Sequence, residues 1–187
     1  MKLSEVNNGS SSHLAVLSEI ANFIKVEEVL ELGTGVLSTS LFLNTQYYPD
    51  LIILDSYENN EAYFNTMRGK FSDCRLFLEL TNLSIADAVE PLSLVNYDLC
   101  LIDDSTTIEE RSKTIQVVTA KCTDTILMVI HDFEHQAYIN AVNPNLNVNS
   151  IKAILPHTAL VWSKDSIVWS ETKSKLLEEA IDDMASN

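Results

Sequence analysis

The sequence predicts an α/β protein with a doubly wound, mostly parallel sheet of about seven strands and helices on both faces. Short apolar runs alternate with amphipathic helical patterns along most of the chain. This alternation is typical of βαβ units, in which right-handed crossovers place a helix between successive parallel strands. Near the C-terminus two apolar runs are joined by a short polar segment. That pattern predicts a hairpin, and hence an antiparallel last strand.

A single domain over residues 1–187 is expected, and it opens with a helix within residues 1–25, starting near Ser12. The segment before Ser12 is rich in Gly and Ser and offers an N-cap. Apolar residues recur at intervals of three and four, as an amphipathic helix requires, at Leu14, Leu17, Ile20 and Ile24.

Repeated βα units are expected over residues 26–142. The predicted parallel strands are Val26–Leu32, Leu51–Leu54, Arg75–Leu80, Tyr97–Ile102 and Thr125–Ile130. The predicted helices that follow them are a pattern through Leu37, Leu41 and Phe42, then Glu61–Phe71, Ser84–Leu92, Ile108–Ala120 and Glu134–Val142.

The C-terminal part begins with a predicted loop, Asn143–Asn149. A hairpin is predicted within residues 157–170, with strands Thr158–Trp162 and Ser166–Trp169. Its two tryptophans are expected in the core or an interface rather than in a substrate cage. An amphipathic helix is predicted over residues 173–185, with a role in packing or in a homo-oligomer contact.

Composition limits the class of protein and its partners. The 187 residues are 46% apolar and 21% charged, and 27 acids against 12 bases give a net charge of −15. This charge repels phosphate backbones and anionic lipids, so neither nucleic acid nor a membrane is an expected partner. The chain also lacks an apolar run of roughly 20 residues and a signal-peptide core, so a cytoplasmic protein is expected. Widely spaced cysteines beside apolar runs favour reduced thiols, at Cys74, Cys100 and Cys122.

Two glycines mark the first strand-to-helix turn. Glycine is scarce, with four in 187 residues, yet Gly33 and Gly35 fall within one tripeptide. Glycine permits positive φ and a close approach of a ligand to the backbone, next to a helix N-terminus. Asp55 lies 22 positions after Gly33, at the predicted end of the second strand, where a carboxylate can accept both hydroxyls of a ribose. The combination favours a bound ligand over a simple tight turn.

These residues resemble a known family. The segment VLELGTGVLSTSLF is similar to the first motif of class I S-adenosylmethionine-dependent methyltransferases, with Glu31-Leu32-Gly33-Thr34-Gly35 as Glu-x-Gly-x-Gly. LIILD resembles the second motif, ending at Asp55, and YDLCLIDD resembles the fourth-strand motif, with Asp98 and Asp103. ILMVIHD is similar to the fifth strand of small-molecule O-methyltransferases, and the terminal hairpin suits that fold.

The resemblance implies a Rossmann-like fold, S-adenosylmethionine as cofactor and methylation of a small molecule at oxygen. It implies that Glu31, Gly33 and Gly35 line the methionine moiety, that Asp55 holds the ribose, and that Asn82 and Leu83 border the adenine. The chain departs from the family in two places: Leu37 stands where many members have a third glycine, and Asp104–Ser105–Thr106 replaces the commoner Gly-x-His.

A nicotinamide-binding Rossmann protein is the strongest alternative hypothesis for the cofactor. Gly33-x-Gly35-x-x-Ser38 nearly matches G-x-G-x-x-G/A, with Asp55 at a suitable distance. Glu31, the missing third glycine and the closing hairpin favour the methyl donor, and little chain remains for a separate substrate domain. A second alternative, a non-catalytic binding or assembly module with the same fold, is suggested by the compact chain and by the departures from the family motifs.

Asp103, His131 and Asp132 are the candidate catalytic residues, because they follow the fourth and fifth strands, whose carboxyl ends border the ligand crevice. His131 could act as general base. In metal-dependent catechol-type O-methyltransferases carboxylates at these strand ends hold Mg²⁺, and Asp103 and Asp132 resemble two of them, but Phe133 replaces the third ligand, an Asn. For Asp132 and Glu134, a structural role as acids that stabilise a helix N-terminus is nearly as well supported as a catalytic role.

The remaining histidines suggest two further interpretations. His131 to His135 fits H-x-x-E-H, a zinc-peptidase pattern, but that motif needs a helix where a buried strand is predicted to end. His13 and His157 are expected to be surface or loop residues outside the site.

Overall fold

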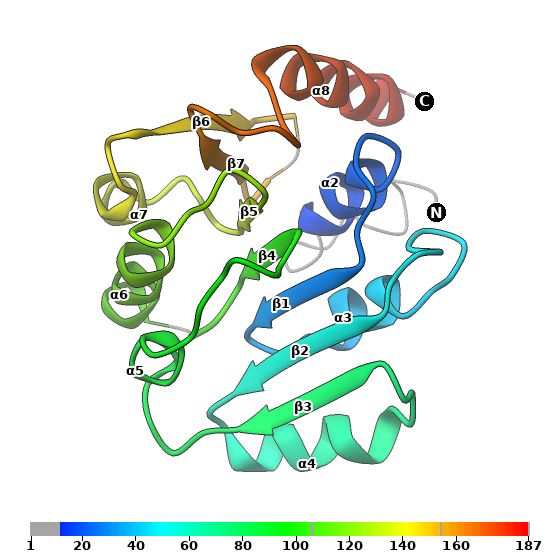
Figure 1. Ribbon diagram of the computed structural model, residues 1–187, viewed down its shortest axis with the longest axis vertical. Coiled ribbons are helices and arrows are strands. Elements are labelled where there is room, and N and C mark those ends of the chain that lie inside the picture. The colour runs from blue at the N-terminus through cyan, green and yellow to red at the C-terminus, as the bar shows by residue number, and fades with distance from the viewer. Residues whose placement is uncertain (1–11, 106, 154, 187) are drawn as a thin grey trace.

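The computed structural model describes residues 12–105, 107–153 and 155–186 and has a seven-stranded sheet with helices packed on both sides (Figure 1). The strand order is β3-β2-β1-β4-β5-β7-β6. β1 to β5 pair in parallel, and β7 runs antiparallel to both β5 and β6. The predicted fold class, including the antiparallel C-terminal hairpin, is confirmed. Gly9 to Ser11 of the predicted N-cap, and Thr106, lie outside the described residues.

The helices and strands alternate along the chain much as the hydrophobic periodicity predicts. The strands are β1 (Glu28–Leu32), β2 (Ile53–Glu58), β3 (Leu76–Leu80), β4 (Leu99–Ile102), β5 (Leu127–Ile130), β6 (Leu146–Ile151) and β7 (Thr158–Ser163). The helices are α2 (Ser12–Ile20), α3 (Val36–Phe42), α4 (Glu61–Lys70), α5 (Ile85–Val89), α6 (Ile108–Thr119), α7 (Gln136–Ala141) and α8 (Glu171–Ser186).

Two apolar clusters cover the two faces of the sheet. Successive residues of a strand point to opposite faces, so Leu99 and Leu101 of β4 join one cluster while Cys100 and Ile102 join the other. The first cluster packs against α2, α3 and α8, and the second against α5, α6 and α7. Within α8, Leu177 and Ile181 are fully buried, so the packing role predicted for this helix is confirmed.

The predicted ends of the first helix and of the second strand are wrong. The first helix ends at Ile20 rather than Ile24, because the chain turns there with Phe23 N–H bonded to the Ile20 carbonyl. The second strand does not end at Asp55: it runs from Ile53 to Glu58, so Asp55 lies in its middle. The residues of β2 alternate between half-buried and buried positions, and the polar Asp55, Ser56 and Glu58 interrupt the continuous apolar run that predicts a buried strand.

The hairpin is formed by different residues from those predicted. β6 arises from the segment assigned to a loop and pairs with β7, whereas residues 166–169 form no strand. Asn147 and Asn149 alternate with more apolar neighbours in β6, and asparagine is uncommon in strands, which masked the period-two pattern. In residues 166–169 the Ser166 hydroxyl instead accepts hydrogen bonds from the backbone amides of Val168 and Trp169, and Trp169 packs in the same core cluster as α2 and α8.

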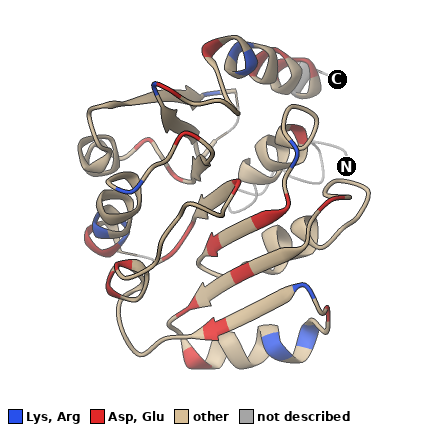
Figure 2. Ribbon diagram, in the orientation of Figure 1, with Lys and Arg blue, Asp and Glu red and all other residues tan. Residues whose placement is uncertain are grey.

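Basic and acidic side chains are distributed differently over the helices and strands. Figure 2 shows Lys and Arg mainly on helices and loops, whereas acidic residues also lie within β1, β2 and β3. In the part of the chain that the structure describes, no helix is long and apolar enough to cross a membrane.

Candidate functional site

The ends of the parallel strands bring the predicted site residues to one edge of the sheet. Backbone hydrogen bonds extend the ladder beyond the strands: Asp103 N–H donates to the Leu32 carbonyl at 2.9 Å, and His131 N–H donates to the Ile102 carbonyl at 3.1 Å. Gly33 N–H donates to the Tyr57 carbonyl at 3.0 Å. The turns after β1, β4 and β5 therefore lie side by side, as expected for a doubly wound sheet.

A cavity of about 630 Å³ lies at this edge, within the size range of small-molecule sites. Its walls come from the glycine turn, from the end of β2 and the start of α4, from the segment after β4, and from α2 and α6. The lining residues that matter for the site are Gly33, Gly35, Glu58, Ile85, Asp103 and His13.

Gly33 is required by the geometry of the first turn. Its φ is +87°, a left-handed conformation that favours glycine. A Cβ built on Gly33 would lie 2.4 Å from the backbone oxygen of Asp103, so any side chain here would collide with the turn after β4. Gly33 therefore allows the first turn to pack directly against the turn after β4, and it lines the cavity without a side chain.

Glu31 lies beneath this turn rather than in the cavity wall. It is fully buried, and three hydroxyl groups donate to its carboxylate at 2.6–2.7 Å, from Ser38, Thr39 and Ser56. Burial raises the pKa of Glu31 to about 7, although these hydrogen bonds oppose the shift. The side chain therefore ties β1 and β2 to α3 and supports the glycine turn from below.

The sequence predicts that Asp55 ends the second strand and holds the ribose, but in the structure Asp55 lies within β2 and Glu58 lies at its end. Asp55 is half-buried in the middle of β2 and accepts a hydrogen bond from the Tyr97 hydroxyl at 2.5 Å, outside the residues that line the cavity. Glu58 ends β2, lines the cavity and is 8% exposed. It accepts a hydrogen bond from Asn60 N–H at 2.7 Å, and burial raises the pKa of its carboxyl group. The strand-end carboxylate is therefore Glu58.

The residues expected beside an adenine lie close to the cavity but do not line it. Asn82 and Leu83 lie in the turn after β3, where Leu83 is exposed, and Ile85, two residues further on, contributes the apolar wall. Leu37, which stands where the resemblance has a third glycine, lines the cavity and is half exposed.

Asp103 and His131 are brought together as predicted. Asp103 Oδ1 lies 3.1 Å from His131 Nδ1 and 3.1 Å from an Arg111 guanidinium nitrogen. Burial alone would raise the pKa of Asp103, but the His131 hydrogen bond and nearby positive charge outweigh it, so this pKa lies below its usual value. His131 is 3% exposed and lies behind the cavity wall, whereas Asp103 lines it.

Arg111 is a site residue that the sequence analysis missed. It is 6% exposed, and it donates to Asp132 at 2.8 Å and to the backbone carbonyls of Asp104 and Ser105. One signal pointed to it: Arg111 lies four and seven positions before Ile115 and Val118, on the buried stripe of α6. A guanidinium between Asp103 and Asp132 occupies the carboxylates suggested as Mg²⁺ ligands, so the structure lends that ion no support.

Two non-glycine residues at this edge of the sheet have an unfavourable backbone conformation. Ser105 and Asp132 both have positive φ, 52° and 58°, in the turns after β4 and β5. Non-glycine residues adopt this conformation at a cost, and such positions cluster at functional sites. Next to them, burial raises the pKa of Asp104 to about 6, while the Thr114 hydroxyl donates to its carboxylate at 2.6 Å.

His13 is the second residue missed, and its predicted surface position is wrong. It is 3% exposed and lines the cavity from α2. Its ring centroid lies 4.4 Å from that of His131, with the ring planes at 63°. Because His13 precedes the first apolar repeat of its helix, nothing in the sequence linked it to residues so far along the chain. His157 does lie in a loop, and residues 131–135 are not helical, so the zinc-peptidase geometry is absent.

No protein-family model matches the chain, and no curated protein matches it in sequence. Solved structures match it in fold. Human methyltransferase-like protein 13, in complex with S-adenosylhomocysteine, is 16% identical, with a TM-score of 0.56 over 94% of this chain and 90% of that one. The S-adenosylhomocysteine-bound methyltransferase PaMTH1 of Podospora anserina is 11% identical, with a TM-score of 0.62 over 82% and 78%. An O-methyltransferase family protein of Burkholderia thailandensis is 14% identical, with a TM-score of 0.55 over 88% and 57%.

The chain therefore has the fold of class I S-adenosylmethionine-dependent methyltransferases, as the motif resemblance implied. Its antiparallel β7, inserted between β5 and β6, also differs from the order 3-2-1-4-5-6 of dinucleotide-binding sheets.

Proposed function

We propose that this protein is an S-adenosylmethionine-dependent methyltransferase that acts on a small molecule, at oxygen. The observation that carries the proposal is the cavity that runs from Glu58, past the backbone of Gly33, to Asp103 and His13. Its position at the carboxyl edge of the sheet is where ligands bind in such folds. Two of the structures with the same fold hold S-adenosylhomocysteine, the product form of that cofactor.

The residues present fit this cofactor. Gly33 and Gly35 line the cavity without side chains, so the backbone of their turn can contact the methionine part. Glu58 at the end of β2 is placed to accept the ribose hydroxyls, a role better suited to it than to Asp55, which is bonded to Tyr97. Ile85 supplies an apolar surface for the adenine, next to Asn82 and Leu83.

When bound, S-adenosylmethionine supplies an electrophilic methyl group on a sulfonium sulfur. The acceptor oxygen forms the new bond to carbon as the sulfur–carbon bond breaks, and the acceptor proton passes to a base. The groups of this chain that can hold that oxygen or take its proton are His13 and Asp103 in the cavity wall, with His131 behind them. Asp132, which is bonded to Arg111, is better suited to positioning that turn than to contact with the acceptor.

Calorimetric titration with S-adenosylhomocysteine tests the cofactor assignment, with NADH as the parallel ligand. We expect the wild-type chain to bind the former and not the latter. Glu58→Ala should weaken binding by about tenfold or more, because it removes a charged acceptor of two hydroxyls. Asp55→Ala is the matched control and should change the affinity less than about threefold. NADH binding alone, or no binding of either ligand, would overturn the proposal.

A screen of hydroxylated small molecules, with mass spectrometry of the products, then tests for transfer. A methylated acceptor confirms the activity. Cofactor binding without any methylated product would favour the second candidate, a non-catalytic module. That candidate is suggested by one observation: Arg111 already forms ion pairs with Asp103 and Asp132, the two carboxylates that resemble the metal ligands of the metal-dependent enzymes.

A further inference from the structure

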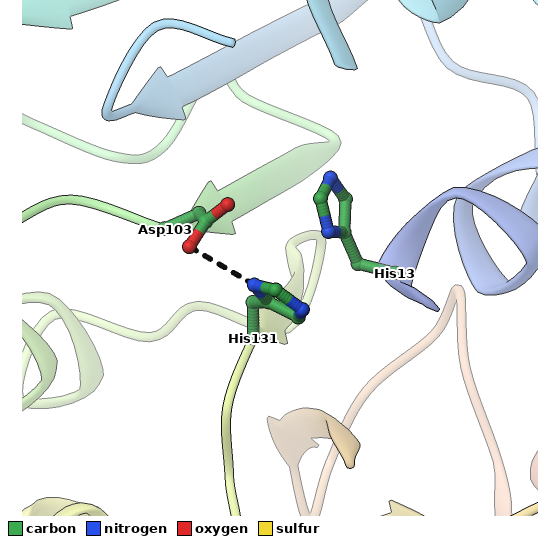
Figure 3. Close-up of side chains that lie close together, drawn as sticks. All are labelled: His13, Asp103 and His131. Atoms are coloured by element: carbon green, nitrogen blue, oxygen red, sulfur yellow. Dashed lines mark hydrogen bonds and ion pairs between the residues drawn. The ribbon is translucent and has the colours of Figure 1, made fainter. Parts of the chain in front are cut away.

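Three side chains with metal-ligating atoms converge beside the cavity. His13 comes from α2, Asp103 from the turn after β4 and His131 from the turn after β5. Figure 3 shows them turned toward one another. One ligand atom from each lies within 4.8 Å of the other two. Two imidazoles and one carboxylate with open positions form a donor set typical of first-row transition metals.

The hydrogen bonds of His131 leave a lone pair facing Asp103. The Ser12 hydroxyl donates its proton to the Pro156 carbonyl at 2.8 Å, so toward His131 Nε2, 3.0 Å away, it can act only as acceptor. His131 Nε2 therefore carries a hydrogen, and in the neutral ring Nδ1 has none. Nδ1 and Asp103 Oδ1 then face each other at 3.1 Å as two electron-pair donors. Such a pair needs a cation between its members, either a second ring proton or a metal ion.

The 3.1 Å separation suits a shared metal ion. Ligands that lie about 2.0–2.2 Å from an ion are roughly 3.0–3.5 Å from each other when they are neighbours in its coordination shell. The bond from His131 Nε2–H to Ser12 is also the kind of outer contact that metal-binding histidines make through their second nitrogen. Ser12 thus orients the ring with Nδ1 toward Asp103 and His13.

His13 provides the second, independent observation. Both of its ring nitrogens are shielded from solvent and have no hydrogen-bond partner among the described residues. Buried polar groups without partners are rare and call for an explanation. A metal ion bound to one of these nitrogens would supply it, because the ring already lies in the cavity wall beside Asp103.

The local charge is compatible with a bound cation. Arg111 contacts Asp103 and Asp132, so its single positive charge is already opposed by two carboxylates, and Asp104 lies next to them. Asp103 Oδ1 faces both His131 and Arg111, whereas no hydrogen bond or ion pair among the described residues uses Oδ2, so the carboxylate keeps free electron pairs for an ion.

We propose that His13, Asp103 and His131 form a binding site for a divalent transition-metal ion of the Zn²⁺ class. Mg²⁺ prefers oxygen ligands and is a poor match for two imidazoles. The site differs from the Asp103–Asp132 pair considered from the sequence in its ligands, its metal and its use of α2. Metal binding is independent of the proposed function. The further step, that the ion holds the acceptor oxygen beside the methyl donor, rests on that function.

The test is metal binding by the full chain after treatment with a chelator, using Zn²⁺, Co²⁺ and Mg²⁺ as separate probes. We expect one Zn²⁺ or Co²⁺ per chain with a dissociation constant in the micromolar range or below, and no binding of Mg²⁺ in that range. His13→Gln and Asp103→Asn should each weaken Co²⁺ binding by at least about tenfold. His135→Ala removes an exposed imidazole and is the matched control, with unchanged binding.

A variant-free measurement covers the case in which these substitutions impair folding. In histidine-selective NMR of the wild-type chain, Zn²⁺ should shift the ring signals of His13 and His131 and leave those of His135 and His157 in place. Absence of binding, binding that survives His13→Gln and Asp103→Asn, or shifts confined to His135 and His157 would each overturn the proposal. S-Adenosylhomocysteine titration of the same metal-free protein shows separately whether the proposed function stands.

Discussion

Two polar clusters lie near the Gly33 turn, and their buried or partly buried carboxylates are stabilised in different ways. In the hydroxyl cluster, Glu31 accepts hydrogen bonds from three hydroxyl groups and has no cation beside it among the described contacts. In the charge cluster, Asp103 and Asp132 are held by Arg111, and His131 adds a further contact to Asp103.

The two clusters differ in whether their polar atoms all have hydrogen-bond partners within the described part of the protein. The hydroxyl cluster reaches the cavity wall only through Ser38, whose hydroxyl already donates to Glu31, and both oxygens of Glu31 are satisfied inside the protein. The cluster is therefore suited to stiffening the glycine turn rather than to binding a ligand. The charge cluster borders the cavity through Asp103 and Arg111, and next to it His13 keeps two nitrogens without partners among the described residues. A polar cluster left incomplete at a cavity wall is the better candidate for chemistry, and a complete one for support.

Arg111→Ala should give the largest effect, because it leaves two partly buried carboxylates, Asp103 and Asp132, without their cation. Removing one partner of a buried ion pair costs about 3–5 kcal/mol. The free energy of unfolding from urea denaturation measures it. Arg68→Ala, at an exposed arginine of α4, is the control and should change stability by less than about 0.5 kcal/mol. If the Arg111 variant lost less than about 1 kcal/mol, the two clusters would not differ in the way described.

The same contrast governs how far the sequence could predict the molecule. The turn at Gly33 and the buried strands β4 and β5 follow from local patterns, since paired glycines in a glycine-poor chain mark a turn and short apolar runs mark buried strands. Half of the residues of β2 and of β6 are polar, and the pairing of these strands depends on neighbouring strands that a local pattern does not contain. The local pattern therefore predicts Asp55 at the end of β2, whereas Glu58 lies there.

The sequence predicts only those site residues that directly follow the ends of strands. Asp103 and His131 come directly after buried strands, so topology alone places them together. His13 and Arg111 reach the same place from α2 and α6, through the packing of helices on the sheet. Helix packing angles and rotations are not encoded in hydrophobic periodicity, which marks a buried face but not what that face meets.

Glu31→Gln tests the hydroxyl cluster through the pH dependence of stability, and its effect on the free energy of unfolding should be intermediate. Burial raises the pKa of Glu31 from its usual 4.5 to about 7. A raised folded-state pKa gives stability that is fully present below the unfolded-state pKa and is lost as pH rises through the folded-state pKa. Between about pH 5 and about pH 8, the wild type should therefore lose on the order of 2 kcal/mol relative to the Gln variant. Urea denaturation of both proteins across this range measures the difference; parallel curves would mean that Glu31 is ionised without cost throughout.

Ser56→Ala should give the smallest effect, because it opens the hydroxyl cluster at one point without removing a charge. It deletes the 2.6 Å hydrogen bond to Glu31 Oε2 and the 2.8 Å contact with Thr34, but Thr39 still donates to the same oxygen. The expected cost is about 1 kcal/mol of unfolding free energy. Ser40→Ala removes an exposed hydroxyl from α3 that bonds only within its own helix, and it should be close to neutral. Equal effects of the two substitutions would mean that the cluster is not a connected support. A clear gap would show that the glycine turn is held from beneath by a network whose members depend on one another.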